Sequence, residues 1–192
     1  MSEGLLTARL RLEPLAPRHR EALAALYADP AVARLLLSPA ADEGAFETLF
    51  RRALACGATH GMWAVWTRQP VAFAGRVGFF AFSDRARPEL AFLLAPPFWG
   101  RGLATEACRA ALAQAFTRHG WEECVALARA DNTAALRVCE KLGMRHEVSL
   151  QHAGGEVRLQ RVSRTEFHEA QPGPAARVPW RLSAPGRSAP RA

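Results

Sequence analysis

The crossing from a strand into a helix near the middle of the chain constrains the fold most. Residues Glu89 to Leu94 have the composition of a strand, prolines 96 and 97 end it, and Gly100-Arg101-Gly102 leads into a helical apolar pattern up to His119. The first N–H groups of a helix have no internal acceptors, and the helix dipole adds positive potential there. Glycines let an anion approach that backbone closely. The crossing predicts a phosphate site at the amides of residues 101–105, with a tight turn that binds nothing as the alternative.

The remaining pattern places this crossing in a sheet with helices on both faces. Seven segments with β-branched and aromatic residues or apolar–polar alternation are expected to be strands: 8–15, 62–67, 71–82, 89–94, 124–130, 144–151 and 156–166. Five segments with apolar residues at helical spacing are expected to be helices: 17–28, 31–36, 42–55, 102–119 and 132–142. This order predicts the α/β (α+β) class, with a mixed, curved sheet of six or seven strands.

Length and charge indicate one globular domain with a tail. The 192 residues suffice for one hydrophobic core, which we expect within residues 1–170. Residues 171–192 hold five of the 13 prolines, four arginines and no acid, and are expected to be a Pro/Arg-rich, disordered extension. The net charge of +7, less the four tail arginines, leaves +3 on the domain. This excess is too small to indicate nucleic-acid binding.

Neither a membrane span nor a secretory signal is expected. No run approaches 18 apolar residues, and the start Met1-Ser2-Glu3-Gly4-Leu5 lacks a basic-then-apolar pattern. The four cysteines have no CxxC or metal-type spacing. These features predict a cytoplasmic protein with reduced thiols and no metal.

Residues 89–107 resemble a known family. The segment Glu-Leu-Ala-Phe-Leu-Leu-Ala-Pro at 89–96, followed by Phe-Trp-Gly-Arg-Gly-Leu-Ala-Thr-Glu-Ala at 98–107, resembles the acetyl-CoA motif of the GNAT superfamily of N-acetyltransferases. The usual motif, (Arg or Gln)-x-x-Gly-x-(Gly or Ala), maps onto Trp99, Gly102 and Ala104. Tryptophan in place of the basic or amide residue resembles the RimJ/RimL branch, whose known members acetylate the N-termini of ribosomal proteins.

Two further segments extend the resemblance to about residues 5–168. Asp131–Met144 is similar to the Asn-x-x-Ser…Lys-Leu-Gly-Phe segment of the branch, and Ala8–Leu15 is similar to its first strand. The resemblance implies a GNAT-type sheet with a splayed central strand pair, in which the strand 89–94 separates from its neighbour after Ala128. It also implies that acetyl-CoA is the acetyl donor.

The splayed strands would hold the pantetheine arm of acetyl-CoA, according to this resemblance. The arm would pair with the backbone of Phe92 to Leu94, and an amide of Leu93 or Leu94 would polarise the thioester carbonyl. The diphosphate would lie at the helix entrance, where the Arg101 side chain adds charge.

The segment Asp131–Met144 would complete the cofactor site. Asn132 would touch the cofactor arm as well as cap its helix, while Arg137 and Lys141 either reach phosphates or form a solvated face. The expected cofactor-binding residues are therefore Phe92, Leu93, Leu94, Trp99, Gly100, Arg101, Gly102, Leu103, Ala104, Thr105, Asn132, Arg137 and Lys141.

The catalytic candidates are Glu89 and Cys139. Glu89 begins the strand whose side chains face the amine in this family, so it is the expected general base, direct or through water. A solvated strand-end glutamate is the alternative. The tyrosine and serine that usually protonate the CoA thiolate are replaced by Cys139 and Ala135. The Cys139 thiol is then a candidate donor, with core packing or a water donor as alternatives.

Three functions remain open from the sequence. The first is N-acetylation of a primary amine by direct attack in a ternary complex, with a peptide or protein N-terminus favoured over a small amine or antibiotic by the branch resemblance. The second is a catalytically silent acyl-CoA-binding module, because both usual proton donors are missing. The third is an RNA- or ribosome-associated protein that uses the arginines of its tail. The sequence does not distinguish a monomer from a homodimer.

Overall fold

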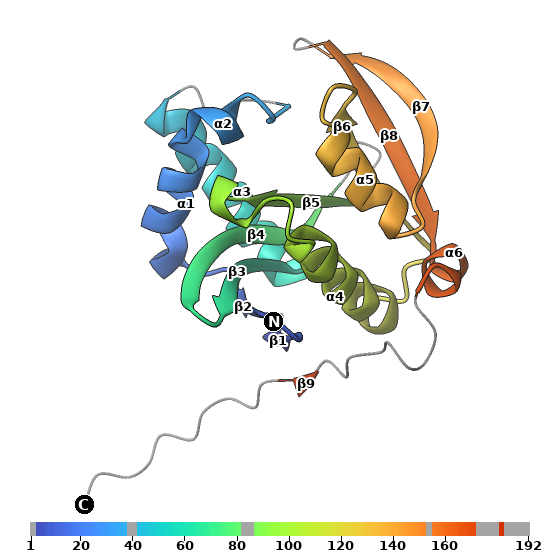
Figure 1. The fold of residues 1–192 in the computed structure, drawn as a ribbon, viewed down its shortest axis with the longest axis horizontal. Coiled ribbons are helices and arrows are strands. Elements are labelled where there is room, and N and C mark those ends of the chain that lie inside the picture. The colour runs from blue at the N-terminus through green and yellow to red at the C-terminus, as the bar shows by residue number, and fades with distance from the viewer. Residues whose placement is uncertain (1–2, 38–41, 82–86, 153–154, 172–180, 183–192) are drawn as a thin grey trace, which may run out of the picture.

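The computed structural model describes residues 3–37, 42–81, 87–152, 155–171 and 181–182 (Figure 1). Phe82 of one predicted strand, Ala153-Gly154 of a predicted turn, and residues 172–180 and 183–192 of the predicted tail lie outside these ranges. The strands are β1 (Leu5–Leu6), β2 (Leu10–Pro14), β3 (Met62–Arg68), β4 (Val71–Ala81), β5 (Pro88–Leu94), β6 (Glu123–Arg129), β7 (Arg145–His152), β8 (Gly155–Ser163) and β9 (Arg181–Leu182). The α-helices are α1 (Arg20–Ala28), α2 (Pro30–Ala33), α3 (Glu43–Thr59), α4 (Leu103–Arg118), α5 (Thr133–Lys141) and α6 (Arg164–Glu169), with 3-10 turns η1 (Pro17–His19) and η2 (Pro96–Phe98).

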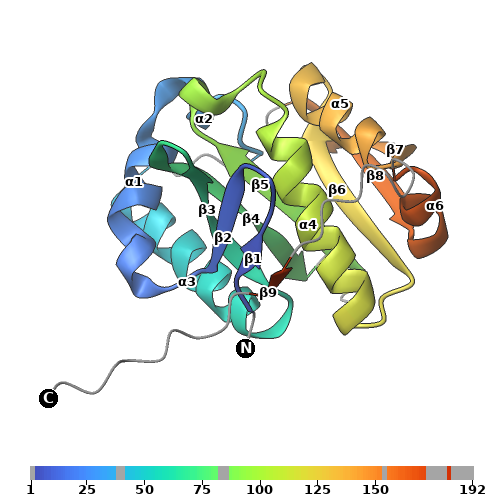
Figure 2. The ribbon, with the colours of Figure 1, turned by 60° about the horizontal axis from the view of Figure 1, so that its bottom comes forward.

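A single mixed sheet has the strand order β7-β8-β6-β5-β4-β3-β2-β1-β9. Neighbouring strands pair antiparallel, except that β5 and β6 run parallel across the α4 crossover. Helices α1–α3 pack on one face of this curved sheet and α4–α6 on the other (Figures 1 and 2). The seven predicted strands are all present, and the two-residue strands β1 and β9 lengthen the sheet at one edge. The predicted fold class is confirmed.

Two main hydrophobic cores lie on the two faces of the sheet, and a third small cluster of Ala53, Met62 and Phe80 joins α3 to β3 and β4. The larger core joins the strands to α4, α5 and α6, through residues such as Phe79, Phe116 and Phe167. The smaller core holds α1–α3 on the opposite face and includes Tyr27 and Leu93. Successive β5 residues point to opposite faces, so this strand contributes to both cores.

The predicted strand 156–166 is too long. The strand β8 ends at Ser163, and the chain then forms α6. A capping box causes the change: the Ser163 side chain accepts a hydrogen bond from Glu166 N at 3.2 Å, and the Glu166 carboxylate accepts one from Ser163 N at 2.8 Å. The Ser-x-x-Glu spacing was readable in the sequence as a helix start.

The central strands β5 and β6 separate almost at once. Their only paired position among the described residues is Glu89 opposite Val125. The separation therefore begins nearer the start of β6 than Ala128, where the sequence resemblance placed it. Because every residue of β5 pairs with β4, the gap opens on the β6 side alone.

Part of the predicted disordered extension is a strand. In β9, Leu182 pairs with Leu5 and Arg181 with Leu6 of β1. The domain boundary near residue 170 stays a prediction, because most of the tail lies outside the described residues.

Candidate functional site

The entrance of α4 consists of open backbone. Gly100 and Gly102 have left-handed φ values of 70° and 73°, and a Cβ on Gly100 would meet nothing within 4 Å. The first bond of the helix runs from Glu106 N to Gly102 O at 3.1 Å, so the N–H groups of residues 103–105 have no acceptor within the helix. This entrance has the exposed backbone and the donors that a diphosphate requires.

Trp99 joins the end of β5 to this entrance. Its indole Nε1 donates a hydrogen bond to Leu94 O at 2.6 Å, while part of the ring stays exposed. The residue that replaces the basic or amide position of the motif therefore bonds the protein backbone and adds no charge. The bond holds the strand end and the helix entrance together as one unit.

The direction of the backbone along β5 decides which amides face the gap. Ala95 N donates to Ala74 O at 2.9 Å, and bonded pairs alternate along an antiparallel ladder. The backbone of Leu93 is therefore directed to β4, whereas the N–H and C=O groups of Phe92 and Leu94 point toward β6. Of the two amides predicted to polarise a thioester, only that of Leu94 has the required direction.

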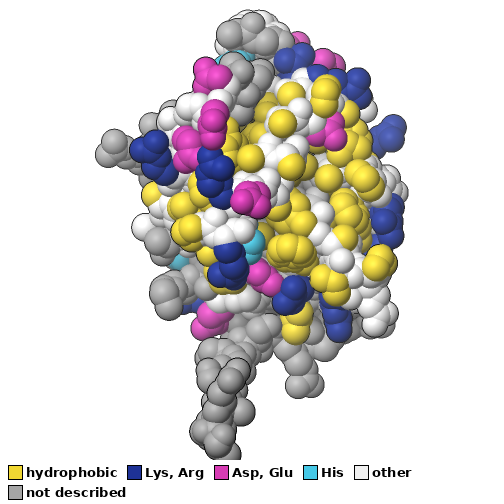
Figure 3. Space-filling view, turned by 90° about the vertical axis from the view of Figure 1, so that its left-hand side faces the viewer, with side chains coloured by type: hydrophobic (Ala, Val, Ile, Leu, Met, Phe, Trp, Pro, Cys, Tyr) yellow, Lys and Arg dark blue, Asp and Glu magenta, His cyan; other side chains and the backbone are white. Residues whose placement is uncertain are grey.

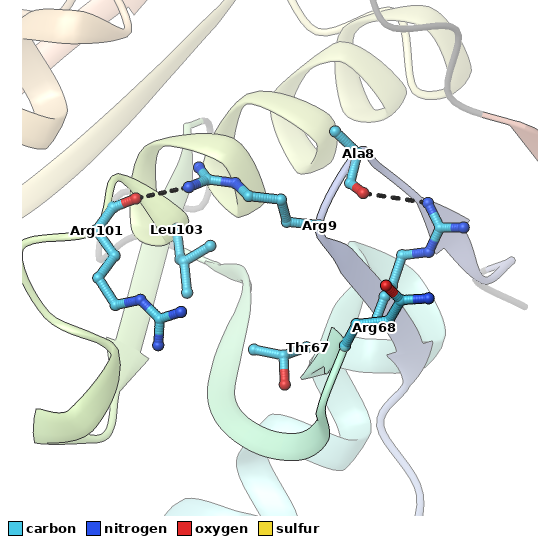
Figure 4. Close-up of a pocket in the computed structure, with 7 residues that line it drawn as sticks. Ala8, Arg9, Thr67, Arg68, Arg101 and Leu103 are labelled. Atoms are coloured by element: carbon cyan, nitrogen blue, oxygen red, sulfur yellow. Dashed lines mark hydrogen bonds between the residues drawn. The ribbon is translucent and has the colours of Figure 1, made fainter.

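A cavity of about 300 Å³ lies beside the α4 entrance (Figure 4). Three arginines from different segments line it, together with smaller residues: Arg9, Arg68, Arg101, Ala8, Thr67, Gln69 and Leu103. The Arg101 side chain points into this space, and its carbonyl accepts a hydrogen bond from Arg9 Nη1 at 2.8 Å. Positive charge thus gathers next to the predicted phosphate site.

Glu106 anchors the N-terminal segment to the first turn of α4. Its carboxylate accepts hydrogen bonds from Thr7 Oγ1 at 2.6 Å, Arg9 N at 2.8 Å and Arg9 Nε at 2.7 Å. Burial alone would raise the pKa of Glu106, but these bonds outweigh it and lower that pKa below its usual value. The anchor holds the first turn of α4 against the segment between β1 and β2.

We expect Glu106→Gln to lower the free energy of unfolding at neutral pH by about 1–2 kcal/mol. The folded-state pKa of Glu106 is depressed, so its contribution is present above the unfolded-state pKa and is lost as pH falls through the folded-state value. Urea unfolding at neutral and acidic pH should show the difference between the two proteins shrinking in acid. Glu169→Gln, at an exposed position, is the control; equal effects of the two substitutions would contradict the anchor.

The segment Asp131–Met144 caps and forms α5, whereas its contact with a cofactor stays a prediction. The Asn132 side chain accepts a hydrogen bond from Ala135 N at 3.0 Å, which is the N-cap of α5. Arg137 and Lys141 lie one turn apart on that helix and are both exposed. Their reach toward a cofactor stays a prediction.

Glu89 lies on the α3 side of the sheet, half-buried at the start of β5. Its carboxylate makes no hydrogen bond or ion pair with any residue that the structure describes. Burial raises the pKa of Glu89 above its usual value, and the positive charges of Arg52 and Arg76 oppose that rise. A carboxylate with a raised pKa and unoccupied lone pairs suits proton abstraction.

Residues 9–145 match the family model of the acetyltransferase (GNAT) domain. The chain belongs to the GNAT acetyltransferase family. The match runs from β2 through the start of β7, so it includes the α4 entrance, Glu89 and Asn132. The family part of the sequence prediction is thereby confirmed.

Comparison with other proteins gives the GNAT fold and leaves the branch open. YkkB of Bacillus subtilis (strain 168), described as uncharacterized, is 29% identical over 91 residues, which span 46% of this chain and about half (53%) of YkkB. An acetyltransferase from Agrobacterium tumefaciens str. C58 superposes with a TM-score of 0.76 at 24% identity, covering 85% of this chain and 96% of that one.

Two further similar structures are complexes with CoA. Spermidine N-acetyltransferase from Vibrio cholerae, in complex with CoA and spermine, has a TM-score of 0.70 at 17% identity and covers 84% of this chain and 99% of that one. RimL, the ribosomal L7/L12 α-N-protein acetyltransferase, in complex with CoA, has a TM-score of 0.67 at 17% identity, with 82% and 95% covered. At these identities the likeness shows the fold alone.

The described part of the chain has neither a helix that could span a membrane nor a metal-ligand group. None of its helices is both long and apolar enough to cross a membrane. No group of three or more His, Cys, Asp or Glu side chains within it could hold a metal ion.

Cys139 is poorly placed to donate a proton in this GNAT domain. It is 1% exposed and packs in the larger core, where burial raises the pKa of its thiol to about 12. A thiol this weakly acidic and this enclosed favours the packing role over the proton-donor role.

We expect Cys139→Ala to change kcat by less than about threefold and to lower the free energy of unfolding by about 1–2 kcal/mol. The physical reason is the lost packing of the sulfur atom in a closed core. Steady-state kinetics and urea unfolding, with the partly buried Cys56→Ala as a matched control, provide the measurement. A large fall in kcat with an altered pH profile would restore the thiol to the mechanism.

Sequence reasoning did not single out a buried, hydrogen-bonded pair of side chains, Arg76 and Tyr27, on the same face of the sheet as Glu89. Arg76 is the single charged residue of β4, within the run Val-Ala-Phe-Ala-Gly-Arg-Val-Gly-Phe-Phe-Ala, and it is buried. Tyr27, the only tyrosine of the chain, bonds it from α1. An arginine inside an otherwise apolar strand was the available signal, because a buried charge normally has a specific partner or role.

Proposed function

We propose that this protein transfers the acetyl group of acetyl-CoA to a primary amine by direct attack in a ternary complex. The observation that carries the proposal is the conjunction of the α4 entrance with the gap between β5 and β6. Trp99 joins the two features, so a diphosphate on the entrance places its attached arm beside the open backbone of β5.

The residues present fit acetyl-CoA. The amides of residues 103–105 and the backbone of Gly100 would hold the diphosphate, with Arg101 supplying positive charge. The N–H and C=O groups of Phe92 would pair with the pantetheine amides, which leaves the Leu94 N–H for the thioester carbonyl. Asn132, Arg137 and Lys141 lie on the far side of the gap and complete the proposed site.

The proposed chemistry uses Glu89 and the Leu94 amide. Glu89 takes a proton from the ammonium form of the acceptor, and the nitrogen lone pair that this frees attacks the thioester carbon. The nitrogen then loses a second proton to water, so that a neutral amide forms. The Leu94 N–H stabilises the negative charge on the carbonyl oxygen. As the C–S bond breaks, the sulfur leaves with the bonding pair and takes a proton from water. Cys139 has no part in these steps.

The proposed acceptor is a peptide or protein N-terminus. Support comes from Trp99 and the segment Asp131–Met144, which resemble the RimJ/RimL branch. A small amine or antibiotic is the alternative within the same fold, and the CoA complexes of RimL and spermidine N-acetyltransferase show that this fold serves both kinds of enzyme. All four cysteines are free thiols, which supports a cytoplasmic location.

Calorimetry with CoA and a thiol-release assay test the proposal together. The assay uses acetyl-CoA with N-terminal peptides, polyamines, aminoglycosides and amino acids. We expect CoA binding that Arg101→Ala weakens, and turnover with at least one amine. CoA binding without any turnover would support the catalytically silent module instead. Absence of CoA binding would overturn the proposal.

A further inference from the structure

An arginine with an unsatisfied donor lies on the acceptor side of the sheet. The Arg76 side chain is 7% exposed, and its Nε donates to the Tyr27 hydroxyl at 2.6 Å. Its Nη1 is buried and has no hydrogen-bond partner. A charged donor left without a partner in the protein interior is strongly unfavourable, so an oxygen that reached it would bind well.

This guanidinium lies close to Glu89. Phe80 is the residue directly opposite Glu89 in the β4–β5 ladder, and the Arg76 guanidinium carbon lies 5.4 Å from the centre of the Phe80 ring. Cross-strand neighbours share one face of a sheet, with Cβ atoms about 5 Å apart. Between Arg76 and Phe80 this face of β4 carries only Gly78, and the Met62 side chain of β3 lies over it. The positive charge of Arg76 still acts on the Glu89 carboxylate.

A second guanidinium approaches the same place from α3. The Arg52 guanidinium carbon lies 4.8 Å from the centre of the Phe80 ring. Within the described residues, no ion pair joins Glu89 to Arg52 or to Arg76, although each arginine acts on its charge. The site therefore combines one carboxylate with two cations that it does not neutralise.

Solvent exposure increases from Arg76 through Glu89 to Arg52. Arg76 is buried, Glu89 is half-buried, and Arg52 is exposed. On the same side of the molecule, around α1, hydrophobic side chains gather into a broad area bordered by charged side chains (Figure 3). An acceptor that enters from the exposed end would pass Arg52, then meet Glu89, and reach Arg76 at its inner end.

We infer that Arg76 is an acceptor-binding residue, whose Nη1 binds a carboxylate or carbonyl oxygen that the acceptor carries close to its amine. This inference rests on the proposed function. It excludes polyamines as good acceptors, because they have no such oxygen and their extra positive charges would lie beside two guanidinium groups.

A matched pair of acceptors tests this assignment on the full chain. One is a short peptide with a free N-terminus, and the other is an alkyl monoamine of similar size without a carbonyl group; spermidine is the third acceptor. Because the amines differ in basicity, the peptide-to-alkylamine ratio of kcat/KM is compared between variants. We expect Arg76→Met to lower this ratio by about 10- to 100-fold through loss of peptide turnover.

Control variants separate recognition from folding. Arg52→Met should lower the ratio less than Arg76→Met, and Arg51→Met, also exposed on α3, should leave it unchanged. Circular dichroism and CoA affinity show whether Arg76→Met folds. If it does not, Tyr27→Phe, which removes the hydroxyl bonded to Arg76 Nε, should lower the ratio in a folded protein.

The outcomes distinguish the two proposals. An unchanged ratio in a folded Arg76 or Tyr27 variant, or spermidine used as well as the peptide, would overturn the role of Arg76 while acetyl transfer stands. If no amine in the panel is acetylated, the proposed function fails, and the role of Arg76 fails with it.

Discussion

Replacing Glu89 by glutamine should lower kcat by about 100- to 10,000-fold, the range that a positioned general base contributes. The amide keeps the shape of the side chain but cannot take a proton from the amine. The affinity for acetyl-CoA should stay within about twofold of the wild-type value, because the proposed cofactor contacts are main-chain groups of β5 and the α4 entrance. Thiol release and calorimetry measure the two quantities separately.

The role of Glu89 as a base also predicts how kcat/KM changes with pH. Burial raises the pKa of Glu89, with partial opposition from Arg52 and Arg76. The base works in its ionised form, so wild-type kcat/KM should fall as pH drops through a value above the usual carboxyl pKa of about 4.3. Glu89→Gln should lack this acid limb. The titration of the amine itself, at higher pH, is common to both enzymes.

Glu21→Gln is a matched control on the same side of the sheet, because Glu21 is an exposed residue of α1. We expect its kinetics to equal those of the wild type. If Glu89→Gln turns over at the wild-type rate across the whole pH range, Glu89 is a solvated strand-end residue and another group must accept the proton.

Replacing Gly75 by alanine should lower the free energy of unfolding by about 3 kcal/mol or more. The φ of Gly75 is 148°, which side chains rarely adopt, and its Cβ would overlap the carbonyl oxygen of Leu93 and lie 2.8 Å from the Leu94 Cα. Relief of this overlap must displace β5, the strand that lines the gap. A folded remainder should therefore also bind CoA more weakly. Urea unfolding and calorimetry measure the two effects.

Gly155→Ala separates backbone strain from the overlap. Gly155 also has a left-handed φ, 115°, but a Cβ there would meet nothing within 4 Å. We expect this substitution to cost about 1–2 kcal/mol, the penalty for the backbone conformation alone. Equal losses of stability in the two variants would show that the approach of β4 to β5 does not require glycine.

The fold was largely predictable from sequence because its signals are local. Strand alternation, the prolines after Leu94 and the Gly100-Arg101-Gly102 turn each act over a few residues, and all seven predicted strands formed. The error at Ser163 has the same origin, since the Ser-x-x-Glu capping box is local and was overlooked. The pairing of Arg181–Leu182 with β1 was not predictable, because it joins segments from opposite ends of the chain.

The same distinction between local features and long-range contacts applies to the candidate site. The sequence by itself determined the open backbone of the α4 entrance, because strand, glycines and helix start are contiguous and the free N–H groups follow from the order of elements. Only the tertiary structure decided that Leu94 rather than Leu93 faces the gap, that Cys139 is enclosed, and that Arg76 lies beside Glu89 with a donor unpaired. These facts depend on strand register and on burial between distant segments, and free energies of burial are set by the neighbours that folding supplies.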